Sequence, residues 1–258
     1  MSSLNLKNIT EDLLDTFLKA GRRAKEISKE GIKVEIKADK SPVTNGDIEV
    51  NEILTSKIKK LTPNIAIISE ETFDTNYADQ HRDFWLIDPI DGTKDYIKNK
   101  DEYTLNAALI SDLKPKIGII YAPAKNRLFF SYGQNCAFEI RDKKKQILNC
   151  KKVHTKEIIG LENSGNTSEE ILEIYKKNKV TKTIKMSSSL KFCILAAGEA
   201  DIYAAKARAF EWDIAAGHAI LEHAGGSVVD HNFKNFLYGK PGFKNLAIIA
   251  KRSEDLKK

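Results

Sequence analysis

Two aspartates, Asp88 and Asp91, end an apolar run in the stretch FWLIDPIDGTKD, residues 84–95. Carboxylates at the end of a buried strand are costly to desolvate unless a positive charge lies beside them. Carboxylate oxygens are hard ligands, which select Mg²⁺, Mn²⁺ or Ca²⁺ over zinc. The Gly92–Thr93 turn precedes a predicted helix start, where free amides attract phosphate oxygens. The spacing therefore indicates a phosphoester site built on divalent metal ions.

Three further acids are candidates for the same site. Glu70 and Glu71 follow another apolar run, and Asp213 begins a helix in the stretch EWDIAAGHAI. Two neighbouring cations need a bridging acid and further acids on each side. Each acid also has a purely structural explanation: Glu70 and Glu71 as exposed acids, Asp88 as a turn acid before proline, and Asp213 as a helix N-cap.

The first half of the chain must place most of these acids. Helical periodicity predicts one helix from Thr10, as N-cap, to about Gly31, and a second from Asn45 to Leu61. Closely spaced apolar runs joined by brief turns then indicate an antiparallel sheet. These predicted strands cover 65–68, 84–87, 104–110, 116–121, 127–132 and 136–140.

The lysine-rich stretch 141–152 is the best candidate boundary, because strand and helix patterns alternate beyond it. We therefore expect an N-terminal α+β part, residues 1–145, with two helices, an antiparallel sheet and most metal ligands. A C-terminal α/β part, residues 146–258, would have a mixed sheet and carry Asp213 and the substrate contacts. Ligands usually occupy the cleft at such a join.

The composition is that of an ordinary soluble globular protein, with 258 residues, 41% hydrophobic and 30% charged. The sequence contains no run of about 18 apolar residues and no signal-peptide pattern, so we expect a cytoplasmic protein without a transmembrane segment. Three scattered cysteines argue against a disulfide framework or a zinc site. The net charge of +6 can attract phosphorylated ligands, although the lysine clusters are also typical of an ordinary solvent-exposed surface.

Four motifs, in chain order, resemble those of the inositol monophosphatase superfamily. They are PVTNGD (42–47), similar to its V-T-x-x-D element; SEE (69–71), similar to G/S-E-E; WLIDPIDGT (85–93), which matches W-x-I-D-P-I-D-G-T; and WDIAAG (212–217), similar to W-D-x-A-A-G. The resemblance spans roughly residues 10–250. The stretch SSLKFC (188–193) resembles the 3′(2′),5′-bisphosphate nucleotidase (CysQ-type) branch rather than the inositol phosphatases.

The resemblance implies a five-layer αβαβα sandwich and a Mg²⁺-dependent, lithium-sensitive phosphomonoesterase. By motif, Glu70, Asp88 and the Ile90 carbonyl would bind one Mg²⁺. Asp88, Asp91 and Asp213 would bind a second, and a third ion is an open alternative.

The same resemblance assigns catalytic and substrate residues. Asp47 and Thr93 would position and deprotonate the attacking water, although Asp47 also reads as a helix-capping acid. The residues expected at the substrate are Glu70, Gly92, Thr93, Ser188, Ser189, Lys191 and Asp213. Helix capping is an alternative for Ser188 and Ser189, and a surface position is one for Lys191.

In the resembled branch the substrate is adenosine 3′,5′-bisphosphate, a by-product of sulfonate transfer in sulfur metabolism, which is converted to AMP and phosphate. The sequence departs from the branch after Tyr203, where Ala204–Ala205 replaces a Pro-Arg pair. Lys206 or Arg208 is a candidate for the missing cation, and a weaker preference for the second phosphate is the alternative.

Two other functions compete with this prediction. An inositol monophosphatase or a fructose-1,6-bisphosphatase would keep the chemistry and change the substrate. A non-catalytic nucleotide- or RNA-binding protein would use the +6 charge but would leave the ordered acids unexplained. We expect a small phosphorylated nucleotide as partner, no nucleic-acid polymer, and a monomer or a homodimer. Loose association with the inner face of the membrane is the alternative to a purely cytoplasmic location.

Overall fold

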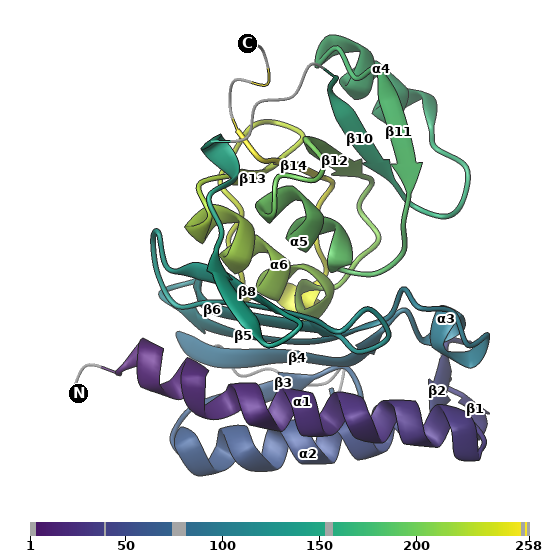
Figure 1. Cartoon of the computed structure of the whole chain (residues 1–258), viewed down its shortest axis with the longest axis vertical. Coiled ribbons are helices and arrows are strands. Elements are labelled where there is room, and N and C mark those ends of the chain that lie inside the picture. Colours follow the sequence, from purple (N-terminus) through teal and green to yellow (C-terminus); the bar gives the residue numbers. More distant parts are fainter. Residues whose placement is uncertain (1–3, 39, 74–80, 153–156, 254–255, 257–258) are drawn as a thin grey trace.

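The computed structural model describes residues 4–38, 40–73, 81–152, 157–253 and 256. The terminal residues of the two expected parts, 1–3 and 257–258, lie outside the described residues. Helices and sheets alternate in five layers, α1 and α2, a seven-stranded sheet, α5 and α6, a five-stranded sheet, and α4 (Figure 1). The predicted αβαβα sandwich is therefore the observed architecture.

The first layer consists of two long helices, α1 (Leu6–Glu30) and α2 (Asn45–Leu61). The buried face of α1 follows helical spacing and includes Leu13, Phe17 and Ala24. The prediction of Thr10 as its N-cap is wrong. Asn5 is the cap and accepts from the Asn8 amide, while the Thr10 hydroxyl donates to Leu6 inside the helix. The helix starts earlier because apolar positions continue N-terminal to Thr10.

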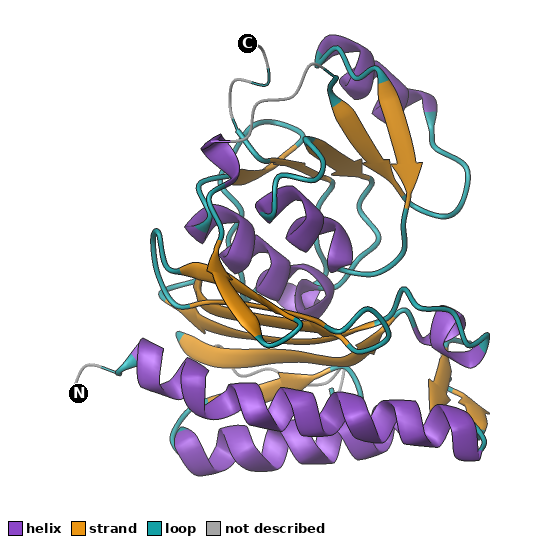
Figure 2. Ribbon diagram, viewed as in Figure 1, coloured by secondary structure: helices purple, strands orange, loops and turns teal. Residues whose placement is uncertain are grey.

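The seven-stranded sheet packs on these helices and has its strands in chain order. Its strands are β3 (Ala66–Ser69), β4 (Asp83–Asp91), β5 (Thr104–Ser111), β6 (Lys114–Ala122), β7 (Arg127–Ser131), β8 (Ala137–Arg141) and β9 (Lys144–Ile147). All neighbours are antiparallel except β3 and β4, which are parallel. β3 and β4 therefore run in the same direction through the sheet that packs on the two long helices (Figure 2), and β3 ends opposite Ile87, next to Asp88.

A short hairpin precedes α2, and a single helical turn follows β4. The hairpin pairs β1 (Val34–Ile36) with β2 (Pro42–Thr44), and the turn is α3 (Thr93–Ile97). Sequence patterns did not predict the hairpin, because all three residues of β1 are exposed and show no alternation.

The middle layer contains α5 (Leu190–Ala196) and α6 (Glu211–His223). Nearly every residue of α6 is buried, because the helix lies between two sheets. On one side it meets β6 at Gly118, where a Cβ atom would lie 2.3 Å from the Ala216 carbonyl oxygen. Only glycine allows the helix to approach the sheet so closely. This approach fixes the helix that carries Asp213.

The second sheet has the order β11-β10-β12-β14-β13 and is mixed. Its strands are β10 (Ile159–Glu162), β11 (Lys182–Lys185), β12 (Ile202–Ala205), β13 (Ser227–Asp230) and β14 (Ile248–Lys251). Helix α4 (Glu169–Lys177) covers its outer face, and two 3₁₀ turns, η1 (Cys150–Lys152) and η2 (Pro241–Phe243), lie in connecting segments. No helix of the described residues combines the length and apolarity needed to cross a bilayer.

We predict that Gly118→Ala destabilises the protein because its Cβ would also lie 2.8 Å from the Ala219 Cβ, so α6 must move. Such overpacking should lower the free energy of unfolding by about 1–3 kcal/mol in urea denaturation. Gly165→Ala is the control, since its Cβ would meet no atom within 4 Å. Equal stability of the two variants would contradict the close packing of α6 on β6.

Candidate active site

The site begins at a β-bulge that turns Asp88 and Asp91 to the same face of β4. In a regular strand, residues three apart point to opposite faces. Here Asp88 pairs with Asn106 and Asp91 pairs with Thr104, so three steps along β4 match two along β5. The extra residue of a bulge restores the common face. The DPID sequence thus presents two carboxylates on one face of the sheet because the bulge interrupts the regular pairing of β4 with β5.

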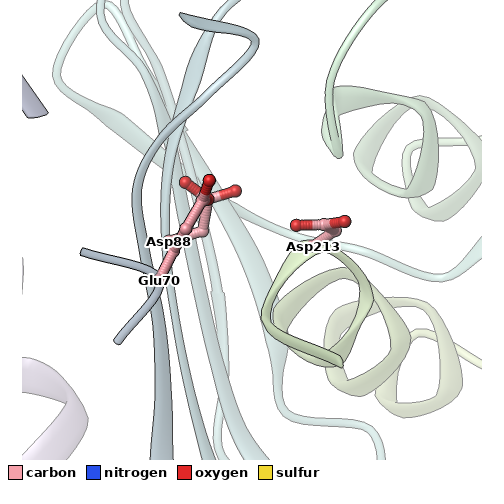
Figure 3. Close-up of side chains that lie close together, drawn as sticks. All are labelled: Glu70, Asp88 and Asp213. Atoms are coloured by element: carbon pink, nitrogen blue, oxygen red, sulfur yellow. The ribbon is translucent and has the colours of Figure 1, made fainter. Parts of the chain in front are cut away.

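Two more carboxylates reach this place from neighbouring elements. Glu70 follows β3, and its amide donates to the Ile87 carbonyl, which holds it beside β4. Asp213 lies in the first turn of α6, and its carboxylate accepts from the Phe210 amide. Figure 3 shows Glu70 and Asp88 side by side, with Asp213 opposite them at the helix start.

Carboxylate oxygens of Glu70, Asp88 and Asp213 lie within 4.8 Å of one another. Among the described residues, this group does not include Asp91, which lines the adjoining cavity together with Glu70 and Asp213. The structure therefore brings three of the four acidic side chains predicted as ligands into one cluster and leaves the fourth beside it. The Ile90 carbonyl, the remaining predicted ligand, accepts a hydrogen bond from the Thr93 hydroxyl.

Burial and mutual repulsion make these acids hard to ionise. Burial, and then the charges of Glu70 and Asp91, raise the pKa of Asp88 well above its ordinary value. Burial also raises the pKa of Asp213 strongly and that of Glu70 to about 7. Such a cluster favours either protons or cations.

The donor set fits a divalent metal ion. Asp88 Oδ1 is buried and, among the described residues, has no hydrogen-bond partner. An unsatisfied buried carboxylate oxygen is costly, and a hard cation would satisfy it. The histidines His218 and His223 do not contribute. Instead, their Nδ1 atoms bond to the hydroxyls of Tyr238 and Ser131.

Asp47 and Thr93 form the pair that the sequence predicted. The Thr93 hydroxyl lies 3.3 Å from Asp47 Oδ1 and 3.1 Å from the Ile90 carbonyl oxygen. Asp47 also accepts from the Thr44 amide and hydroxyl, so its capping role in α2 coexists with the contact to Thr93. Burial is the main reason that the pKa of Asp47 rises to about 6.

A lysine that the sequence analysis missed lies beside the acids. Lys37, next to β1, places its Nζ 2.7 Å from Glu71 and 3.6 Å from Glu70. Burial lowers the pKa of Lys37, but the two glutamates outweigh burial and raise it overall. The hairpin thus supplies a positive charge at the edge of the cluster. No local sequence signal marks this contact, because it joins an exposed strand to a distant one.

Ser189 connects the C-terminal half to Asp91. Its amide donates to Asp91 Oδ2, and its hydroxyl bonds to Thr104 and Asn106 on β5. Ser189 is only 2% exposed, so its side chain is committed to these protein contacts. Residue spacing gave no sign of this link, which spans nearly a hundred residues.

Ser188 and Lys191, the other residues of the SSLKFC stretch that were expected at the substrate, also lie near Asp91. Ser188 has a φ of 56°, unusual for a non-glycine residue. Lys191 donates from Nζ to the carbonyl oxygens of Ser188, at 2.6 Å, and Met186, at 3.2 Å. It is 4% exposed and, mainly because of burial, its pKa falls to about 8.

A cavity of about 510 Å³ joins these groups. All seven residues expected at the substrate line it, namely Glu70, Gly92, Thr93, Ser188, Ser189, Lys191 and Asp213. Gly92 has a φ of 96° and accepts from the Asp95 and Tyr96 amides, which closes the turn at α3. The cavity is large enough for a small organic ligand.

Comparisons with known proteins agree with this geometry. Residues 5–255 match the profile of the Inositol monophosphatase family. The "3′(2′),5′-bisphosphate nucleotidase CysQ" of Salmonella typhimurium is 33% identical over 81% of this chain and 86% of its own length. That of Buchnera aphidicola is 34% identical over 86% of both chains. The crystal structure of CysQ from Bacteroides thetaiotaomicron superposes with a TM-score of 0.78 and 28% identity, covering 96% of this chain and 97% of that chain.

We predict that Mg²⁺ stabilises the wild-type protein and that Asp213→Asn loses most of this effect. A site at about 100 times its Kd adds about 2.7 kcal/mol, or roughly 5–10 °C in Tm for a chain of this size. Without metal, Asp213→Asn should melt at the same temperature or higher, because it relieves repulsion while the asparagine oxygen still caps α6. Thermal melts with EDTA and with MgCl₂ measure both effects.

Asp101→Asn is the matched control for this experiment. Asp101 is an exposed acid that pairs with Lys125 and does not belong to the cluster. Its variant should keep the full Mg²⁺ effect. A full effect in Asp213→Asn as well would contradict ion binding at the cluster.

Proposed function

The chain belongs to the inositol monophosphatase family, and from that premise we propose that it is a Mg²⁺-dependent 3′(2′),5′-bisphosphate nucleotidase. It removes the 3′-phosphate of adenosine 3′,5′-bisphosphate and yields AMP and inorganic phosphate. Nucleotidases of this name are about a third identical to it over most of both chains. The three free cysteines of the structure fit an enzyme of the reducing cytoplasm.

The observation that carries this proposal is the convergence of Glu70, Asp88 and Asp213 beside a substrate-sized cavity. A nucleic-acid-binding protein would gain nothing from a buried acidic cluster, because carboxylates repel phosphates. A metal-dependent phosphatase needs such a cluster to bring cations to a phosphate.

Two Mg²⁺ ions fit the arrangement. Glu70, Asp88 and the Ile90 carbonyl would hold one ion, and Asp88, Asp91 and Asp213 would hold the other. When bound, the ions would neutralise the negative charge of the phosphoryl group and lower the pKa of a coordinated water molecule. An ion held by Asp88 would satisfy its Oδ1 atom, which has no hydrogen-bond partner among the described residues.

Thr93 and Asp47 activate the water that attacks phosphorus. The water would donate to Thr93 Oγ1, which lies within hydrogen-bond distance of both Asp47 Oδ1 and the Ile90 carbonyl oxygen. An ion held by the Ile90 carbonyl would leave Asp47 as the acceptor of the threonine proton. As the oxygen–phosphorus bond forms, a proton moves from water to the threonine oxygen and the threonine proton moves to Asp47. A pKa of about 6 keeps this carboxylate ionised near neutral pH and able to accept a proton.

The remaining groups orient the substrate. The amides of Gly92 and Thr93 would hold the phosphate that leaves, at the turn closed by α3. Ser188, Ser189 and Lys191 line the same cavity and would border the nucleoside. Ser189 is buried, and its amide donates to Asp91. Its contribution to substrate binding therefore acts through the position of the Asp91 carboxylate.

We predict that phosphate release depends on the nucleotide and on Mg²⁺. Adenosine 3′,5′-bisphosphate should give a higher kcat/KM than inositol 1-phosphate or fructose 1,6-bisphosphate, and EDTA should abolish release from all three. A malachite-green assay of inorganic phosphate measures each rate. Preference for inositol 1-phosphate would instead identify the alternative substrate of the family.

Asp88→Asn should lower kcat by at least about 10²-fold at saturating Mg²⁺, the size of one lost electrostatic stabiliser. Asp112→Asn, an exposed acid that pairs with Arg82, is the control and should keep wild-type turnover. Near-normal turnover in Asp88→Asn would rule out its bridging role.

A further inference from the structure

The helical turn α3 carries Thr93 but has little structure of its own. It spans five residues, all of which the structure describes, and Tyr96 is the one buried side chain among them. The turn lies beside the β1–β2 hairpin, close to where α1 ends and α2 begins (Figure 1). A single turn of helix is not stable by itself, so contacts with the rest of the protein must hold it. The position of Thr93 therefore depends on what holds Tyr96.

The Tyr96 side chain ties α3 to α1. Its hydroxyl donates to the Ala24 carbonyl oxygen of α1, at an O···O distance of 2.7 Å. Its ring packs edge-on against Tyr103, with the ring centroids 4.9 Å apart. Tyr96 is fully buried, and burial raises the pKa of its hydroxyl, which therefore stays protonated and able to donate. The ring is thus held both by α1 and by the residue that precedes β5.

Gly46, in the first turn of α2, faces the same ring. A Cβ atom at this position would lie 2.7 Å from both the hydroxyl oxygen and the Cε1 atom of Tyr96. The backbone of Gly46 is not left-handed, so lack of space, and not backbone conformation, excludes a side chain here. An alanine at position 46 would overpack the contact and push either the ring or the start of α2.

The contact between Thr93 and Asp47 is sensitive to small shifts of either helix. The Thr93 hydroxyl and Asp47 Oδ1 are 3.3 Å apart, which is long for a hydrogen bond between two oxygens. Asp47 directly follows Gly46 in α2. Tyr96 follows Thr93 by three residues, so their side chains are neighbours on one side of α3. The Tyr96 ring therefore acts on the segments that carry both members of the pair.

We propose that Tyr96 is a positioning residue that sets the distance between Thr93 and Asp47. This inference rests on the proposed function, in which these two residues activate the attacking water. The Tyr96 hydroxyl holds α3 to α1, and its ring bears on α2 at Gly46, so one side chain fixes both partners. The missing side chain at Gly46 is what allows the tyrosine to fit between the helices.

The test combines Gly46→Ala with Tyr96→Phe. Gly46→Ala should lower kcat for adenosine 3′,5′-bisphosphate by about 10- to 100-fold at saturating Mg²⁺, the scale of a small misplacement of catalytic groups. The double variant Gly46→Ala/Tyr96→Phe should regain most of this kcat, because a ring without the hydroxyl is released from Ala24 and can move away from the new methyl group. A residue that only stabilised the fold would change Tm and leave kcat unchanged below that temperature.

Gly160→Ala is the matched control. Its Cβ would lie 3.2 Å from the ring of Tyr175 on α4, so this variant also crowds a tyrosine but should keep wild-type kcat. Tyr96→Leu is a further variant, which keeps an apolar side chain in the core and loses the hydroxyl and the ring. It should lower kcat by about 10-fold. Thermal melts with and without Mg²⁺ check that each variant folds and binds ions.

The outcomes separate this inference from the proposed function. Wild-type kcat in Gly46→Ala, or a loss that Tyr96→Phe does not restore, overturns the role of Tyr96 and leaves the nucleotidase proposal standing. An equal loss in Gly160→Ala also overturns it, because the effect is then one of crowding in general. If Gly46→Ala does not fold, wild-type kcat in Tyr96→Leu overturns the role instead. Absence of phosphate release by the wild type with Mg²⁺ overturns the proposed function and this inference together.

Discussion

The close approach of buried carboxylates is the interaction on which the rest of the structure depends. Glu70, Asp88 and Asp213 face one another within 4.8 Å, where their charges repel and burial removes the water that would screen them. A protein that brings such groups together must hold them in place through the packing around them, or compensate their negative charge with cations. This fold does both: two β-strands and a helix fix the acids, and Lys37 supplies part of the opposing charge.

The packing that holds the cluster depends on two local departures from regular structure, one in a strand and one between a strand and a helix. At β4 a bulge turns Asp88 and Asp91 to one face of the sheet. At β6 a missing side chain, Gly118, lets α6 approach closely enough for Asp213 to reach that face from the other half of the chain. The acidic site is therefore a product of the join between a sheet and the helix layer above it. Neither half of the chain contains it alone.

Much of the fold and of the site could be predicted from the sequence, and the exceptions share one cause. Helical and strand periodicity predicted α1 apart from its start, α2 and most strands of the first sheet, because buried apolar residues repeat at the period of the element. The residue types and motif spacing pointed to Glu70, Asp88 and Asp213. The contacts of Lys37 with Glu71 and of Ser189 with Asp91 were not predictable, since they join segments distant in sequence and leave no local pattern.

The arrangement of charge in the cavity also limits how a substrate can bind. Glu70, Asp91 and Asp213 line the cavity together with Lys191 and Arg208. Burial raises the pKa of Asp91, and the charge of the Lys191 ammonium opposes this shift, while two backbone carbonyls hold the ammonium in place. A phosphate that enters this cavity therefore meets fixed charges of both signs. Cations at the acidic cluster must offset the buried carboxylates before the phosphate can approach them.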